Sequence, residues 1–257
     1  MTALLLAAIM LALCVCAVLP EADHAALPSK VDLRRNFDRW GLALKSQAPR
    51  GTCSVFAMTA AIEYALAKHR RRGLQLSEEY LNWAANDAHP GRNRDGGFFH
   101  ELWAGFEKDG ICALREMPYA SAYDPRRRPS HVALDRGRIL RSVGLRWRWI
   151  KEWDVTTGLT PEQFDQTRQV LAGGFPVCAG MRWPKEATWT DGILDMRSPD
   201  QVFDGHSVLI VGYVDKPEHP GGGVFLVRNS QEGGAYQALP YAYVREYAND
   251  LGWVADR

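Results

Sequence analysis

The sequence predicts an α+β protein, because a helical pattern and a pair of strand patterns lie in separate parts of the chain. After Cys53, apolar residues recur at the spacing of a helix at Val55, Met58, Ile62 and Leu66. Residues 207–213 and 224–228 are instead short runs rich in β-branched residues. The glycines and prolines of 215–223 separate these two runs and indicate a turn.

The expected helix places Cys53 in its first turn. Thr52 is a suitable N-cap, and a basic run from Lys68 to Arg72 precedes Gly73, which is expected to end the helix. The positive end of the helix dipole stabilises a thiolate, so the pKa of Cys53 is expected to be low and the residue reactive. The alternative is that Cys53 is a small buried apolar residue, as many free cysteines are.

The two expected strands bring two further polar residues together. If 207–213 and 224–228 form an antiparallel hairpin, His206 before the first strand lies beside Asn229 after the second. A thiolate nucleophile needs an imidazole to exchange its proton, and the imidazole needs a third group to orient it. His206 and Asn229 are therefore candidates for the base and its orienting partner.

The order Cys53, His206, Asn229 resembles that of the papain-like cysteine proteases, the family of papain and the cathepsins. The resemblance extends from Leu27 to about Tyr243. The matching residues and segments are Leu27–Arg34, Gln47, Gly51, Cys53, Phe56, Ala57, Ser77–Leu81, Asp95–Gly97, Asp109–Ile111, Pro118–Tyr119, Gly205–His206, Gly212–Tyr213 and Asn229–Ser230.

The resemblance implies a two-lobe fold over 27–257 with the active site between the lobes. It implies a helical lobe over about 31–143 and a β-barrel-like lobe over about 144–257, with 161–172 as a surface helix. In the implied reaction Cys53 attacks a peptide carbonyl and forms a thioester acyl-enzyme, while His206 shuttles the proton and Asn229 orients His206. The amide of Gln47 and the N–H of Cys53 would stabilise the oxyanion.

Three departures from the family pattern affect this interpretation. Arg50 stands where the family signature has a disulfide-forming cysteine, and Ser54 replaces the aromatic residue after the nucleophile. Gln231 replaces the tryptophan expected after Asn229-Ser230, so we expect a less shielded His–Asn pair and a weaker ion pair. Two alternatives to a protease therefore stay open: a catalytically silent peptide-binding protein and a transpeptidase that uses the same acyl-enzyme.

The resemblance also implies a substrate cleft for an extended peptide or protein chain. Glycines at 96 and 97 would leave room for the substrate backbone. The walls of the main specificity pocket would be formed by Phe98, Phe99, Val177 and Ser207. Such a pocket would prefer a bulky apolar residue, and no insertion obviously blocks the cleft, so an endopeptidase is expected. The alternative for the two phenylalanines is that they are ordinary core residues. The candidate substrate-binding residues are Gly96, Gly97, Phe98, Phe99, Val177 and Ser207.

The N-terminus carries an apolar run from Ala3 to Leu19, which predicts a signal peptide over 1–19 with cleavage after Ala17. We therefore expect a secreted or periplasmic protein; an uncleaved membrane anchor is the alternative. About ten residues separate the expected cleavage site from Leu27, too few for the long inhibitory pro-segment of typical relatives. Together with the missing family disulfide, this suggests a bacterial member. Location, a protein inhibitor or weak intrinsic activity would then restrain the enzyme.

Composition and residue spacing indicate which other partners the protein is expected to lack. The 257 residues carry a formal net charge of +1, which argues against a nucleic-acid-binding protein. Histidines 89, 100, 131 and 219 show no metal-ligand spacing, so we expect neither a metal nor a cofactor. A monomer is expected. Cys112 and Cys178 are expected to be buried free thiols, although the spacing alone leaves a disulfide between them open.

Overall fold

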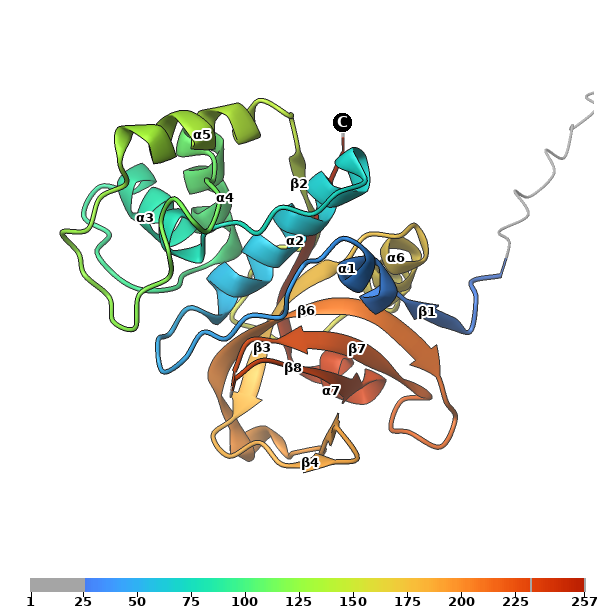
Figure 1. Cartoon of the computed structure of the whole chain (residues 1–257). Helices are drawn as coiled ribbons and strands as arrows, with labels where there is room; N and C mark the ends of the chain where they lie inside the picture. Colours follow the sequence, from blue (N-terminus) through green and yellow to red (C-terminus); the bar gives the residue numbers. More distant parts are fainter. Residues whose placement is uncertain (1–25, 232, 257) are drawn as a thin grey trace, which may run out of the picture.

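The helices occupy mainly the first half of the chain and the strands the second half, which confirms the α+β class (Figure 1). The computed structural model describes residues 26–231 and 233–256. The expected signal peptide over 1–19 lies outside them. The described elements are β1 (Lys30–Asp32), α1 (Arg34–Arg39), α2 (Cys53–Arg70), α3 (Glu78–Ala88), α4 (Phe99–Asp109), α5 (His131–Arg141), β2 (Arg146–Lys151), α6 (Pro161–Ala172), β3 (Val177–Pro184), β4 (Trp189–Thr190), β5 (Ile193–Leu194), a 3₁₀ turn (Pro199–Gln201), β6 (Val202–Asp215), β7 (Gly223–Asn229), β8 (Ala235–Pro240), α7 (Tyr241–Tyr247) and β9 (Ala248–Ala255).

The strands form one sheet in the order β2-β9-β3-β6-β7-β8-β5-β4, with β1 paired to β6. All described pairs are antiparallel except the single pair that joins β5 to β8. The long strand β6 pairs with β1, β3 and β7, so it occupies the middle of the sheet. This position brings the start of β6 and the end of β7 close to the helical part of the molecule.

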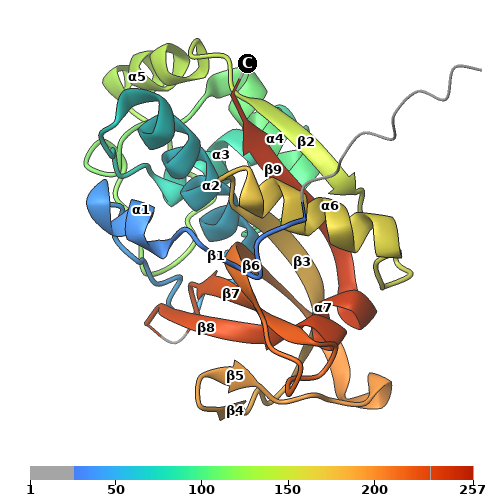
Figure 2. The same cartoon turned by 90° about the vertical axis from the view of Figure 1, so that its right-hand side faces the viewer.

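Helix α2 passes between helices α3–α5 and the sheet, as both views of the cartoon show (Figures 1 and 2). All of its residues from Ser54 to Ala67 are buried, which explains why the helix contains so many alanines and no strongly polar face. The helix ends two residues earlier than its sequence suggests. Arg71 takes the left-handed conformation that ends it, with φ at 56°. Gly73 was therefore wrongly expected to end the helix; a Cβ there would lie 2.0 Å from the Trp40 carbonyl oxygen, so close packing requires the glycine.

The two ends of the described chain both join the sheet. Strand β1 pairs with β6 near the N-terminus, and β9 pairs with β2 and β3 at the C-terminus. Beside β9, Trp147 of β2 packs 5.6 Å from Phe99 and 6.1 Å from Trp103 of α4, measured between ring centroids. Strand β2 thus connects the sheet to the helical lobe.

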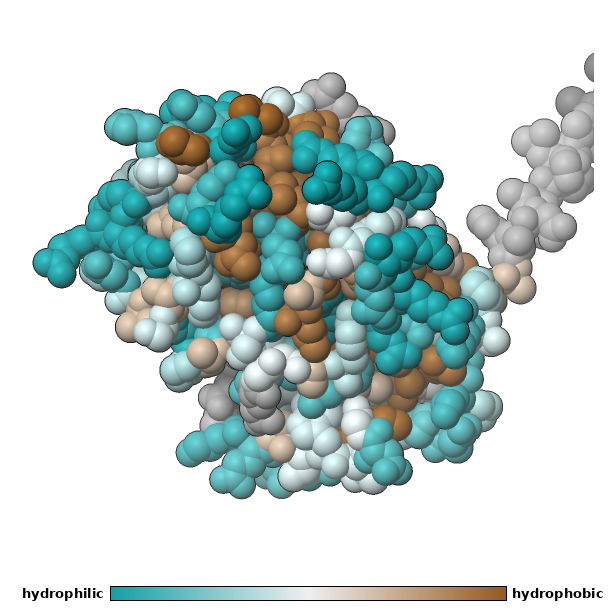
Figure 3. Space-filling model, viewed as in Figure 1, coloured by the Kyte–Doolittle hydropathy of each residue, from teal (hydrophilic) through white to brown (hydrophobic). Residues whose placement is uncertain are grey.

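Hydrophilic residues cover most of the face shown in Figure 3. Few large apolar side chains are strongly exposed in the described part of the chain: Phe98, Val132, Ile139, Trp153 and Val155. The rings of Phe98 and Trp153 contact each other, with centroids 5.0 Å apart. An exposed aromatic pair of this kind often marks a binding surface.

A buried arginine fixes the loop that leads into α2. Arg50 Nη1 lies 2.6 Å from Glu79 Oε2 on α3, and Arg50 Nη2 lies 2.7 Å from Asp95 Oδ1. Its Nη1 also donates to the Ala120 carbonyl at 2.9 Å, and the guanidinium stacks 4.4 Å from the centre of the Tyr119 ring. The residue that replaces the family's cysteine therefore joins three chain segments by non-covalent contacts.

We predict that Arg50→Ala destabilises the protein by about 3–5 kcal/mol, because it leaves the buried Glu79 carboxylate without its main cation. Urea unfolding of the full chain measures the change. Arg138→Ala is the matched control, since its pair with Asp135 is exposed on both sides and should change stability by less than about 0.5 kcal/mol. Equal stability of the two variants would contradict a structural role for Arg50.

Candidate active site

Three segments bring the candidate catalytic residues together. Cys53 is the first residue of α2, His206 lies near the start of β6, and Asn229 ends β7. Strands β6 and β7 form the antiparallel hairpin that the sequence predicts, with Leu209 paired to Arg228. His206 Nε2 lies 2.9 Å from Asn229 Oδ1, and the imidazole also forms a hydrogen bond with Cys53. Because Asn229 takes Nε2, the Nδ1 atom is the ring nitrogen left for the thiol.

The surroundings of the thiol favour its ionised form. Burial alone would raise the pKa of Cys53, but the hydrogen bond and charge of His206 outweigh it. Backbone hydrogen bonds from Ser207 and Ser54 add to this effect, so the net pKa of the Cys53 thiol is lowered. For His206, burial acts to lower the pKa, and the contacts with Cys53 and Asn229 reverse this and raise it. The two shifts together favour a thiolate beside an imidazolium.

The other two described cysteines provide an internal comparison. Cys112 and Cys178 are separate, buried free thiols in the structure. Burial raises the pKa of Cys112 to about 12 and that of Cys178 well above its usual value. Cys53 differs because it is partly exposed and has a basic partner. Of the three, it alone has the properties of a reactive cysteine.

Gln47 lies in the loop before α2 and is held firmly on both sides of its amide. Its Nε2 donates to the Arg50 carbonyl at 2.9 Å, and its Oε1 accepts from Ser230 Oγ at 2.8 Å. Its backbone N–H also donates to the Ser230 carbonyl at 2.9 Å. Since an amide nitrogen carries two hydrogens, one N–H of Gln47 is left to contact another acceptor.

A tryptophan that the sequence did not indicate shields the imidazole. The ring of Trp183 on β3 lies 4.7 Å from the His206 ring, measured between centroids. His206 is only 6% exposed and Asn229 only 3%. The expectation that Gln231 leaves this pair poorly shielded is therefore wrong, because Trp183 reaches His206 from the neighbouring strand. Met181 pairs with His206 in the sheet, and Trp183 lies two residues further along β3. The shielding role of Trp183 could therefore be predicted only once the register of β3 and β6 was known.

Comparison with known protein families identifies the family of this chain. The model of the family described as "Papain family cysteine protease" matches residues 27–245. The chain belongs to this family. A sequence search of curated proteins found no match. The protein is thus a cysteine peptidase, and its substrates are peptides or proteins.

Solved structures share the fold at low sequence identity. Xylellain, a cysteine protease from Xylella fastidiosa, is 21% identical, with a TM-score of 0.68 over 91% of this chain and 88% of its own. Digestive procathepsin L 3 of Tenebrio molitor larval midgut is 19% identical, with a TM-score of 0.61 over 91% and 72%. The ragweed pollen allergen Amb a 11 in its proform is 19% identical, with a TM-score of 0.59 over 92% and 67%.

A cavity of about 300 Å³ lies beside Cys53 in this peptidase. Gly97 and Phe98 line it from the helical lobe, and Ser207 lines it from β6, as expected. Ser54, which replaces an aromatic residue of the family pattern, also lines it. Trp153, which follows β2, completes the wall with Phe98; nothing in its local sequence indicated this position.

The two phenylalanines have different roles. Both line the cavity, as expected, but Phe98 is 38% exposed, whereas Phe99 is only 1% exposed and packs against Trp147. Phe99 is therefore a core residue that also contributes to the cavity wall. Gly96 is buried behind the cavity, where a Cβ would lie 2.2 Å from the Gly51 carbonyl oxygen. It allows the loop to approach Gly51, and the neighbouring Gly97 faces the cavity.

Val177 was wrongly assigned to the pocket. It has no exposed surface and lies in the core at the start of β3. Gly180 and Met181, three and four residues further along the same strand, line the cavity instead. Because β3 runs from the core toward the cleft, a short shift along the strand separates a core position from a pocket position.

A buried carboxyl group also lines the cavity. Asp250 on β9 lines the cavity although the residue is only 4% exposed. Burial raises the pKa of Asp250 to about 7, against the opposing effects of the Lys151 charge and the Gly180 N–H. The carboxyl therefore changes its charge near neutral pH. No local sequence pattern places Asp250 in the site.

The described ranges contain neither a membrane-spanning helix nor a cluster of metal ligands. No helix in 26–231 or 233–256 is long and apolar enough to span a membrane. In the same residues, no group of three or more histidine, cysteine or acidic side chains is arranged to hold a metal ion.

We predict that Asn229→Ala lowers the upper pH limit of kcat/KM, because Asn229 raises the pKa of His206. A hydrogen bond of about 1 kcal/mol corresponds to about 0.7 pH unit. A pH–rate profile measures the shift, with Asn36→Ala as the control because Asn36 bonds to Tyr64 away from the cavity. The lower limit, set by Cys53, should move less. An upper limit that is the same in all three proteins would contradict this role.

Proposed function

We propose that this papain-family peptidase is an endopeptidase that uses Cys53, His206 and Asn229 as its catalytic triad. The observation that carries the proposal is that Cys53 and His206 line the same cavity, with His206 bonded to Asn229 and shielded by Trp183. The contact with His206 also lowers the pKa of the Cys53 thiol. Cys53 Sγ attacks the peptide carbonyl carbon, and His206 gives its proton to the leaving amine. His206 then takes a proton from water, whose oxygen attacks the thioester and releases the acid product.

The oxyanion of each tetrahedral intermediate would be stabilised by two N–H groups. One is the backbone N–H of Cys53 at the start of α2, and the other is the second N–H of the Gln47 amide. The contacts of Gln47 with Arg50 and Ser230 fix the amide before substrate binds. A donor fixed in advance contributes more to the transition state than one that must be ordered during the reaction.

Endopeptidase action is supported by the segments that line the cleft. In the part of the chain that the structure describes, the cavity walls come from both lobes, at 51, 53–54, 94–95, 97–99, 153, 180–181, 205–207 and 249–250. No further described segment lines this cavity, so an extended substrate could continue past both ends.

We also propose that the protein is a secreted or periplasmic monomer. Its activity would be restrained by its location or by a protein inhibitor.

We predict turnover of a fluorogenic peptide with Phe at the second position before the cut. Cys53→Ala should abolish it, and Gln47→Ala should lower kcat by about 10²–10³-fold. Gln169→Ala is the control, since this exposed amide on α6 lies outside the cavity. Absence of turnover in folded wild-type protein would favour the silent binding protein, and ligated products in place of hydrolysed ones would identify a transpeptidase.

Specificity is proposed to depend on Asp250 as well as on the aromatic wall. Phe98 and Trp153 favour a bulky apolar side chain in the cavity. Above pH 7 the Asp250 carboxyl would be mostly ionised and would favour a basic side chain that reaches it; below pH 7 it would be mostly neutral. The pocket is therefore expected to change its preference with pH.

We predict that a ratio of two kcat/KM values rises about tenfold between pH 5.5 and 8. The numerator is the value for the fluorogenic peptide with Lys at the second position before the cut, and the denominator is the value for the peptide with Phe there. One ion pair formed in a partly buried site would account for a change of this size. Asp250→Asn keeps the shape and should remove the pH dependence of the ratio. Asp256→Asn serves as the control because Asp256 does not line the cavity. A ratio that varies equally in Asp250→Asn and wild type would contradict the assignment.

A further inference from the structure

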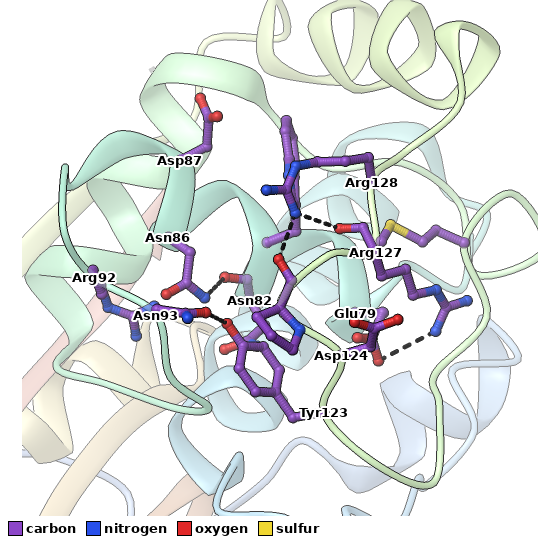
Figure 4. A pocket seen from close by; sticks show the side chains of 13 residues that line it. Glu79, Asn82, Asn86, Asp87, Arg92, Asn93, Tyr123, Asp124, Arg127 and Arg128 are labelled. Atoms are coloured by element: carbon purple, nitrogen blue, oxygen red, sulfur yellow. Dashed lines mark hydrogen bonds and ion pairs between the residues drawn. The ribbon is translucent and has the colours of Figure 1, made fainter.

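A second cavity, of about 220 Å³, lies in the helical lobe and has no assigned function (Figure 4). It is bounded by α3, by Arg92 and Asn93 in the following loop, and by the segment 117–128. Neither Cys53 nor His206 lines it. The cavity and the catalytic cleft nevertheless share the loop 92–98, of which Arg92 and Asn93 face this cavity and Gly97 and Phe98 face the cleft.

Most of the neutral polar groups around this cavity already have partners. Asn82 donates to Asp95 at 3.0 Å and accepts from the Gly96 N–H at 3.1 Å. Asn86 donates to the Arg94 carbonyl at 3.0 Å and accepts from its N–H at 3.1 Å. These side chains support the loop 92–98 and have little capacity left for a ligand.

The carboxylates around the cavity are also paired. Glu79 lies 2.6 Å from Arg50 and 3.7 Å from Arg127. Asp87 lies 2.5 Å from Lys108, and Asp124 lies 3.6 Å from Arg126. Each negative charge that lines the cavity therefore has a cationic partner, and none requires a cation from solution.

Two guanidinium groups are left with free donors. Arg92 has a side chain only 4% exposed, and its Nη1 is buried without a hydrogen-bond partner among the described residues. Its Nη2 donates to the Gly96 carbonyl, and its Nε lies 3.4 Å from Glu101. Arg128 donates from Nη1 to two backbone carbonyls, and in the described part of the chain no carboxylate lies within 4.0 Å of it.

An unsatisfied buried guanidinium is unfavourable, because arginine cannot lose its proton to escape the cost of burial. Burial lowers the pKa of Arg92 despite the opposing charge of Glu101, which indicates incomplete compensation. The free groups at this cavity are thus donors on two cations, and a ligand that satisfies them must supply acceptors and negative charge. Carboxylate and phosphate oxygens match the planar donors of arginine.

We propose that the cavity binds a small oxyanion, a carboxylate or a phosphate group, between Arg92 Nη1 and Arg128. The side chains of Arg92 and Arg128 approach the pocket from different sides in Figure 4. Binding acts on the cleft through Arg92, because the same guanidinium contacts Gly96 and Glu101. The site is therefore a regulatory position behind the loop that carries Gly97 and Phe98.

Binding is tested in full-length Cys53→Ala protein, which makes the result independent of the proposed function. Calorimetry and thermal shift are measured with inorganic phosphate and with citrate, at ionic strength held constant with sodium chloride. We expect saturable binding that Arg128→Gln weakens at least tenfold. Arg126→Gln is the matched control, since Arg126 is 91% exposed, does not line the cavity and removes the same charge.

A response to phosphate alone or to citrate alone supports the proposal and identifies the chemical class. Absence of saturable binding of either ion overturns it, as does equal affinity in Arg128→Gln and Arg126→Gln. Arg92→Gln should abolish binding; if this variant does not fold, Arg128→Gln still decides. In active protein, the saturating ion should change KM for the fluorogenic peptide at least twofold in wild type but not in Arg128→Gln. Binding without this change would overturn the regulatory part alone.

Discussion

The burial of α2 between the helical lobe and the sheet is the constraint on which the site depends. Because the helix is enclosed from Ser54 to Ala67, its first residue is fixed relative to both lobes. Cys53 therefore meets His206, which comes from the central strand of the sheet, without help from a flexible loop. At this position two features stabilise the Cys53 thiolate: the positive end of the helix dipole and the imidazole of His206.

Arg50 stands where the family signature has a disulfide-forming cysteine. It links the surrounding segments without a covalent bond. Its contacts with Glu79, Asp95 and Ala120 hold the entry loop of α2, the loop of the cleft glycines and the segment after Met117 in one arrangement. Asp95 is next to Gly96, so the arginine also determines where the cleft wall lies. A link of this type is insensitive to reducing agents, whereas a disulfide is not.

The proximity of Cys53, His206 and Asn229 could be predicted from sequence because each position follows from a local pattern. A cysteine at a helix start and a hairpin that joins His206 to Asn229 need no tertiary information beyond strand pairing. The pocket could not be predicted as well, because its walls depend on positions along β3 and β9. Val177 and Gly180 lie on one strand, yet the first is in the core and the second in the cleft. Trp183 and Asp250 reach the site through sheet register, which single-sequence patterns do not contain.

The pH dependence of Cys53 alkylation by an epoxide-type inhibitor tests the central claim most directly. Mass spectrometry can assign the label, since Cys112 and Cys178 are buried. The account predicts fast labelling at a pH well below the ordinary thiol pKa of about 8.5. In His206→Ala, labelling should slow and should rise only near that pH. Wild-type labelling that rises only near pH 8.5, and that His206→Ala leaves unchanged, would contradict a working thiolate–imidazolium pair.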